Sequence, residues 1–106
     1  MLLWANEPTP KAMTYARHVY HVYAVRAAQR SQWQQALQEK GIQTGIHYPI
    51  PVHLLPAYSD LGYAAGDFPH AERAANEVLS LPMFPELTRS QCEEVSIALV
   101  ALASPK

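Results

Sequence analysis

The segment GIHYPIPVHLLPAY, residues 45–58, most limits the folds that are open to this chain. Pro49, Pro51 and Pro56 fix φ and remove three backbone donors, so the segment continues neither a helix nor a central strand. Because prolines also restrict the unfolded chain, part of the entropy cost of ordering the loop is removed in advance. The sequence therefore predicts a stiff loop in the middle of the chain, and such loops hold side chains at set positions where a ligand is met.

Regular elements are predicted before this loop. Residues 18–25, HVYHVYAV, are rich in β-branched and aromatic residues on both alternating faces, which favours a strand that is covered on both sides. Ser31 and Gln34 have the spacing of a capping box and predict the start of a helix. Lys40 and Gly41 are typical of a helix C-terminus. A second strand is expected over residues 42–48.

The remaining elements follow the loop. A helix is expected to begin near Asp67, which would cap it, with Pro69 in the first turn. Residues 78–84 read as a short extended piece, and Thr88 with Gln91 forms a second capping box. Helical spacing predicts that the last helix buries four side chains, those of Cys92, Val95, Leu99 and Leu102.

This element order predicts an α/β (α+β) fold, a small two-layer sandwich of a short sheet with about three helices. Residues 1–17 are expected to be a lead-in or tail, and residues 18–106 the folded domain. A fold of this class hosts many functions, so the site must be argued from its residues.

Composition excludes several classes of function. Eight Lys and Arg against nine Asp and Glu leave no basic surplus to attract nucleic acid or an anionic membrane surface. The single cysteine, Cys92, excludes an internal disulfide and a paired-cysteine metal site, and its expected role is a small buried hydrophobe. We expect a cytoplasmic setting because the chain has neither a membrane-length apolar run nor the pattern of a signal peptide.

The histidines are the main candidates for chemistry. His47 and His53 are six residues apart, which fits no recognised zinc spacing, so no metal site is predicted. His21 is expected to be a hydrogen-bonded structural residue within its strand, and His70 to be solvated. From composition alone, two interpretations of the histidines and tyrosines of the loop stay open: ligand contact, or packing of a domain edge.

Three strings carry a resemblance to a known family: HVYHVYAVR, EKGIQTGIHYPIPVHLLPAY and GDFPHAERAANEVLSLPMFPELT. With the closing amphipathic helix, they resemble the C-terminal small domain of the DegT/DnrJ/StrS sugar aminotransferases. These are fold-type I enzymes that use pyridoxal phosphate (PLP) to aminate keto-sugars attached to nucleotides. The resemblance covers about residues 18–103. Leu55 departs from the family, which often has glutamine there, so no polar contact is carried over to this position.

The resemblance implies which residues meet the substrate. The loop lies at the mouth of the active site in this family, so His47, Tyr48 and His53 become substrate-binding candidates, held in place by the prolines. The PLP lysine, the acid that pairs with the pyridine nitrogen and the phosphate-binding residues belong to the large N-terminal domain. None of the three lysines has the setting of a Schiff-base residue: Lys11, Lys40 and Lys106.

The expected function is therefore that of a fragment or truncated gene product, catalytically incomplete and without PLP when alone. Its expected partners are the large aminotransferase domain, a nucleotide-sugar and, because of the apolar Leu2, Leu3 and Trp4, a second copy of itself. The alternative, from a different class, is a stand-alone binding or interaction module that keeps the fold without catalysis.

Overall fold

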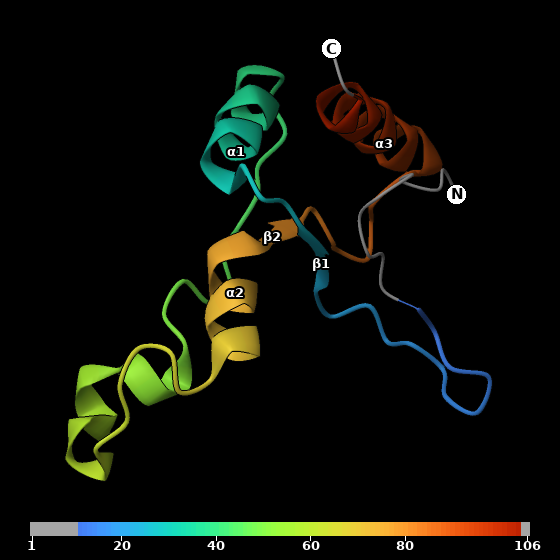
Figure 1. Ribbon diagram of the computed structural model, residues 1–106. Coiled ribbons are helices and arrows are strands. Elements are labelled where there is room, and N and C mark those ends of the chain that lie inside the picture. The colour runs from blue at the N-terminus through green and yellow to red at the C-terminus, as the bar shows by residue number, and fades with distance from the viewer. Residues whose placement is uncertain (1–10, 105–106) are drawn as a thin grey trace.

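The computed structural model describes residues 11–104. Two short strands, β1 (Tyr23–Arg26) and β2 (Val78–Leu81), lie at the centre of the molecule (Figure 1). Three helices surround them: α1 (Arg30–Glu39), α2 (Pro69–Glu77) and α3 (Arg89–Ala103). Two 3₁₀ helices, η1 (Val52–Leu54) and η2 (Pro56–Leu61), lie between α1 and α2 in the chain. The predicted α/β class, a short sheet with about three helices, is confirmed.

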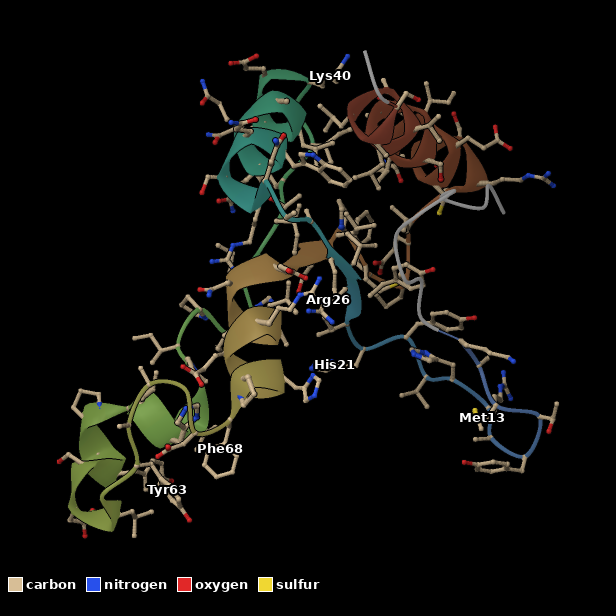
Figure 2. The ribbon with its side chains drawn as sticks, in the orientation of Figure 1. Met13, His21, Arg26, Lys40, Tyr63 and Phe68 are labelled. Carbon is tan, nitrogen blue, oxygen red and sulfur yellow. The ribbon has the colours of Figure 1, made fainter. Side chains whose placement is uncertain are left out.

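The sheet is antiparallel, with Tyr23 opposite Leu81 and Arg26 opposite Val78. The predicted first strand is shorter than expected, because residues 18–22 precede the part that pairs with β2. His21 is exposed on this lead-in segment, so its prediction as a structural strand residue is wrong (Figure 2). The apolar side chains of this segment are exposed, because no other part of residues 11–104 covers them.

The second predicted strand, over residues 42–48, is also wrong. Only Gly45 pairs with the sheet, as an isolated antiparallel bridge to Ser80. The Gly45 N–H donates to the Ser80 carbonyl at 3.0 Å, and the Ser80 N–H donates to the Gly45 carbonyl at 2.7 Å. A longer ladder would run into Pro49 and Pro51, which lack the N–H groups that it needs.

Two of the predicted caps are absent and one is present. The α1 helix begins at Arg30, and no side chain caps it, so the Ser31 capping box is wrong. Asp67 accepts a hydrogen bond from the Ala64 N–H at 2.8 Å instead of capping α2. At α3 the capping box is confirmed, since the Gln91 N–H donates to Thr88 Oγ1 while the Thr88 N–H donates to the Gln91 side chain.

The end of α1 and the start of α2 follow the expectation. Gly41 has a φ of 75°, the left-handed conformation that glycine adopts at low cost, and its N–H donates to the Gln38 carbonyl. Pro69 is the first residue of α2, where its missing N–H costs nothing.

The core lies between the sheet, α1 and α3. Leu37 from α1 and Leu79 from β2 are completely buried. They belong to a cluster with four further buried side chains, Val25, Ile42, Ala98 and Leu99. Val95 and Leu102 pack against this cluster as predicted, whereas Cys92 is exposed. The prediction that Cys92 is buried is wrong: its side chain lines the open pocket between the sheet and α3.

Charged groups fix α2 against β1. The Glu77 carboxylate forms an ion pair with Arg26 at 2.8 Å and accepts a hydrogen bond from Arg73 Nε at 2.9 Å, and the Glu77 carbonyl accepts from the Ala27 N–H. The hydrogen bond from Arg73 and the charge of Arg26 hold the pKa of Glu77 below its ordinary value. The Arg30 guanidinium donates to two carbonyls at the end of α2, which satisfies groups that the helix leaves free.

Two segments project from the core (Figure 1). One is the N-terminal arm, residues 11–22, and the other is the turn of chain that contains η1 and η2. The radius of gyration is 15.7 Å, whereas a compact domain of this length has about 13 Å. Five large apolar side chains of the arm are exposed: Met13, Tyr15, Val19, Tyr20 and Val22. In the described part of the chain, no helix has the length and apolar character to cross a bilayer.

Candidate functional site

The proline-rich loop leaves the core at the Gly45–Ser80 bridge and leads through η1 and η2 toward α2. In Figure 1 its far part, drawn in green, lies at the end of the molecule away from α3. Pro51 has a φ of −64° and is extended just before η1, and Pro56 begins η2. Prolines thus stand at the start of both 3₁₀ helices, which the sequence analysis did not predict.

His47 is anchored to the sheet. Its Nδ1 lies 2.9 Å from Oγ of Ser80, whose side chain is buried in β2. Nε2 on the other side of the ring makes no hydrogen bond within residues 11–104, and the residue as a whole is exposed. A histidine held through one nitrogen presents the other in a fixed direction.

Among the large apolar side chains of the loop, that of Tyr48 is the most exposed. Its exposed fraction is 74%, and its ring meets the His47 ring edge to face, with centroids 5.4 Å apart. Ile50 and Val52 follow it and are exposed as well. We call residues 48–52 the arch, because they stand out from the molecule between His47 and His53.

His53 lies at the other end of the arch and is buried. Its side chain is only 7% exposed, and its Nε2 lies 3.6 Å from Oε2 of Glu72 in α2. Its ring packs against Phe68 at a centroid distance of 4.9 Å, and Phe68 in turn packs against Tyr63. Figure 2 shows Tyr63 and Phe68 beside each other on the turn that leads into α2.

The structure thus separates the three candidates by environment. His47 and Tyr48 are neighbours with solvent-facing groups, whereas the contacts of His53 are with α2 and the turn before it. Sequence reasoning missed the two anchoring partners, Ser80 and Glu72. Ser80 had a signal, since it is the one polar residue of an otherwise apolar strand, VLSL. Glu72 had none, because its contact with His53 spans nineteen positions.

The remaining histidines lie outside the loop and are exposed. His18 accepts a hydrogen bond from the Tyr20 N–H at 2.8 Å on the exposed arm, and His70 is exposed as predicted. Tyr58 is partly exposed in η2. Residues 11–104 contain no group of three His, Cys, Asp or Glu side chains arranged to hold a metal ion.

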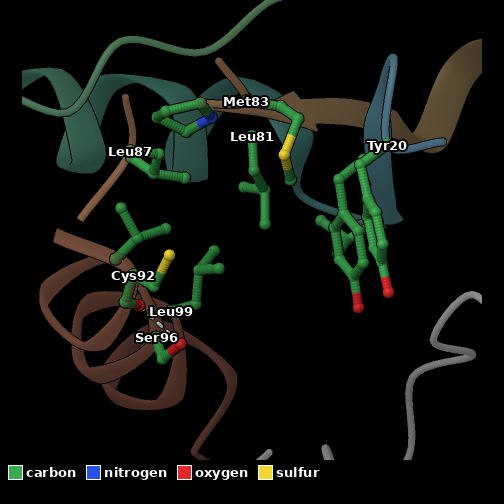
Figure 3. A pocket seen from close by; sticks show the side chains of 11 residues that line it. Tyr20, Leu81, Met83, Leu87, Cys92, Ser96 and Leu99 are labelled. Atoms are coloured by element: carbon green, nitrogen blue, oxygen red, sulfur yellow. Dashed lines mark hydrogen bonds between the residues drawn. The ribbon is translucent and has the colours of Figure 1, made fainter. Parts of the chain in front are cut away.

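A separate pocket of about 200 Å³ lies between the sheet and α3 (Figure 3). It is lined by Tyr20, Tyr23, Val25, Leu81, Pro82, Met83, Leu87, Cys92, Val95, Ser96 and Leu99. None of these side chains is charged, and the pocket lies against core residues rather than against the arch. An anionic ligand such as a nucleotide-sugar would find no cation there.

Comparisons with known proteins agree with the sequence motifs. The profile described as the DegT/DnrJ/EryC1/StrS aminotransferase family matches residues 3–100. A "pleiotropic regulatory protein" of Geobacillus stearothermophilus is 49% identical over 82% of this chain and 23% of its own length. The dTDP-3-amino-3,4,6-trideoxy-alpha-D-glucose transaminase of Streptomyces venezuelae is 44% identical over 73% of this chain and 20% of its own length.

A solved structure extends the likeness to the fold. DesV of S. venezuelae, in complex with a ketimine intermediate, superposes with a TM-score of 0.87 at 37% identity. The match covers 97% of this chain and 29% of that one. The chain spans about a quarter of the length of the relatives that it matches.

Proposed function

Because the chain belongs to the DegT/DnrJ/EryC1/StrS aminotransferase family, we propose that it forms the C-terminal small domain of a PLP-dependent nucleotide-sugar aminotransferase. In this role it supplies a wall of the active site that meets the substrate. The observation that carries the proposal is that the matched region, residues 3–100, contains a stiff loop that holds a tyrosine and a histidine nitrogen out to solvent.

We assign the direct substrate contacts to His47 and Tyr48. The Nε2 of His47 and the hydroxyl of Tyr48 are groups that bind sugar hydroxyls or phosphate oxygens, and both stand at the exposed start of the loop. His53 belongs to the same loop, but its burial favours an indirect contribution over contact with the sugar. None of these residues is assigned a proton transfer.

The described residues do not fit PLP itself. A lysine that forms an imine with this cofactor needs a pocket that desolvates its amine or a cationic neighbour. Lys11 and Lys40 are both exposed, one on the N-terminal arm and the other at the C-cap of α1. The sequence-based expectation places the cofactor in the large domain, so no step of the amino transfer is assigned to a residue of this chain.

The exposed apolar surface of the N-terminal arm indicates a partner. The apolar residues of the N-terminal arm are uncovered within residues 11–104, and exposed apolar groups of this kind mark surfaces that pack against another protein part. We propose that the large aminotransferase domain covers them in the full-length enzyme. Leu2, Leu3 and Trp4, which were expected to promote self-association, lie outside the described residues. A cytoplasmic setting, consistent with the single cysteine, is part of the same proposal.

A chimera tests the proposal. Residues 3–100 would replace the matching segment of the S. venezuelae transaminase, with the unaltered transaminase as control. We expect the chimera to form amino-sugar from a nucleotide-linked keto-sugar and an amino donor. In parallel, the isolated chain is mixed with PLP and freed of excess cofactor. We expect it to retain none, because it offers no desolvated lysine.

Two results would contradict the proposal. One is a stable, stoichiometric imine between PLP and the isolated chain that is lost on changing Lys11 or Lys40. The other is a folded chimera without activity while the isolated chain binds nucleotide-sugar. This second result would support the stand-alone binding module instead.

A further inference from the structure

The arch is held at both of its ends by side chains from other elements. At its start, His47 contacts Ser80 of β2, and at its finish, His53 contacts Glu72 of α2. The five residues between these anchors include two prolines, whose fixed φ values leave few ways to move one end independently of the other. The position of the exposed Tyr48 therefore depends on both anchors.

Glu72 joins three separate segments at the second anchor. Its carboxylate accepts the Gly66 N–H, with both oxygens 2.9 Å from the nitrogen, and its Oε2 faces His53 Nε2. Glu72 itself lies in the first turn of α2, where the helix dipole favours a negative charge. One carboxylate thus links η1, the turn at Gly66 and α2.

Within the described part of the chain, His53 is buried in surroundings that offer its Nε2 no partner other than Glu72. The side chain is more than nine-tenths buried, and its Nε2 has no hydrogen-bond partner within residues 11–104. The separation of 3.6 Å from Glu72 is about 0.4 Å beyond the usual hydrogen-bond range, so a small approach completes the bond. Phe68 covers one side of the ring and excludes the alternative of solvation there.

From this geometry we propose that Glu72 and His53 form a clamp that positions the arch, and with it Tyr48, for the substrate. The inference rests on the proposed function for the identity of the substrate, but the clamp itself is a property of this chain. Glu72 and His53 are positioning residues, because they act through the loop and touch no reacting atom.

Amide hydrogen exchange of the full chain tests the clamp without any need for aminotransferase activity. Glu72→Met keeps a side chain of similar length but removes both acceptor oxygens. The amides to follow are those of Leu54 and Leu55, which donate to the Pro51 and Val52 carbonyls of the arch. We expect them to exchange about tenfold faster, while those of β2 and α3 are unchanged. The matched control is Glu93→Met, at an exposed position of α3, which should leave the arch unaffected.

Two further variants separate positioning from general packing. Glu72→Gln retains an acceptor for Gly66 and a polar group opposite His53, so it should restore most of the slow exchange. His53→Phe keeps the ring against Phe68 but removes Nε2. It should speed the same amides, but by no more than Glu72→Met does, because Glu72→Met also removes the acceptor of the Gly66 N–H. Adding His53→Phe to Glu72→Met should change nothing further, because the contact is already broken.

Three results would overturn the clamp. Unchanged exchange at the arch in Glu72→Met would show that this contact does not hold it. Equal acceleration in the arch, β2 and α3 would show general destabilisation, and additive effects of His53→Phe and Glu72→Met would show that the two side chains act separately. An inactive chimera with slow, Glu72-dependent exchange would refute the proposed function while leaving the clamp intact.

Discussion

Replacing Ser80 by alanine tests the anchor of His47, because the expected loss of folding stability can be given a size. The change removes the buried Oγ that lies 2.9 Å from His47 Nδ1. It leaves the two backbone hydrogen bonds between Ser80 and Gly45 in place, since these use only main-chain groups. The strand bridge should therefore persist while the histidine ring loses its fixed partner.

The expected loss of stability is about 1 kcal/mol, the net contribution of one ordinary hydrogen bond. No larger penalty is expected, because His47 is exposed and its Nδ1 can bind water once the hydroxyl is gone. For a domain of this size, that loss lowers the melting temperature by roughly 4–8 °C. Urea unfolding should show a lower midpoint with the same m value, since the buried surface hardly changes.

Ser96→Ala is the matched control. Its hydroxyl donates to the Cys92 carbonyl within α3, a contact that alanine, a better helix former, replaces at little cost. We expect its stability to stay within about 0.5 kcal/mol of the parent. In Ser80→Ala alone, NMR should show the His47 ring signals moving toward those of a solvated histidine. Unchanged ring signals, or a loss above about 3 kcal/mol with an altered m value, would refute this account of the anchor.

Three further outcomes are expected. Gly45→Ala should lower stability by about 1–3 kcal/mol and break the His47–Ser80 contact in an NMR or crystal structure, because the added Cβ would lie 2.8 Å from His47 Cε1. Leu79→Ala should cost about 2–5 kcal/mol in denaturant titrations, since Leu79 is fully buried, whereas Leu61→Ala at an exposed position should cost far less. The pKa of Glu77 in the folded protein lies below its ordinary value of 4.5, so ionised Glu77 stabilises the fold fully above pH 4.5. This contribution is lost as the pH falls through the folded-state pKa. In Glu77→Gln, the stability measured by denaturant titration should therefore fall less steeply at acidic pH.

How far the sequence predicts this fold depends on the range of the interaction. The capping box at Thr88, the glycine at the end of α1 and the proline at the start of α2 were correct, because each is decided within a few residues. The Ser31 and Asp67 caps were wrong although they use the same chemistry. The Asp67 carboxylate accepts a hydrogen bond from the Ala64 N–H instead of capping α2. A rule based on residue spacing does not predict this competing bond.

Strands were predicted less well than helices because their limits depend on partners. The apolar pattern of residues 18–25 does not indicate which of them pair with another strand. Within this segment only the residues of β1 pair with β2. The expected strand at 42–48 became a single bridge at Gly45, although the prolines that stop it were visible in the sequence.

In the candidate site, too, local features could be predicted from the sequence and long-range contacts could not. The proline loop was visible in the sequence, but the burial of the His53 side chain was not, since it depends on contacts with Glu72 and Phe68. Ser80 and Glu72 lie 33 and 19 positions from their histidines in the chain. Contacts across such separations leave no periodic pattern, so they needed the folded structure.

The central claim is that the exposed start of the loop meets the nucleotide-sugar. The most direct test is steady-state kinetics of the active chimera carrying Tyr48→Ala or His47→Ala, compared with Glu93→Ala at an exposed position of α3. We expect the first two variants to lower kcat/KM for the nucleotide-sugar at least about tenfold, equivalent to about 1.4 kcal/mol of transition-state binding. Their melting temperatures and their reaction with the amino donor should stay as in the parent. Unchanged kcat/KM for the sugar in both variants, with the fold intact, would contradict the claim.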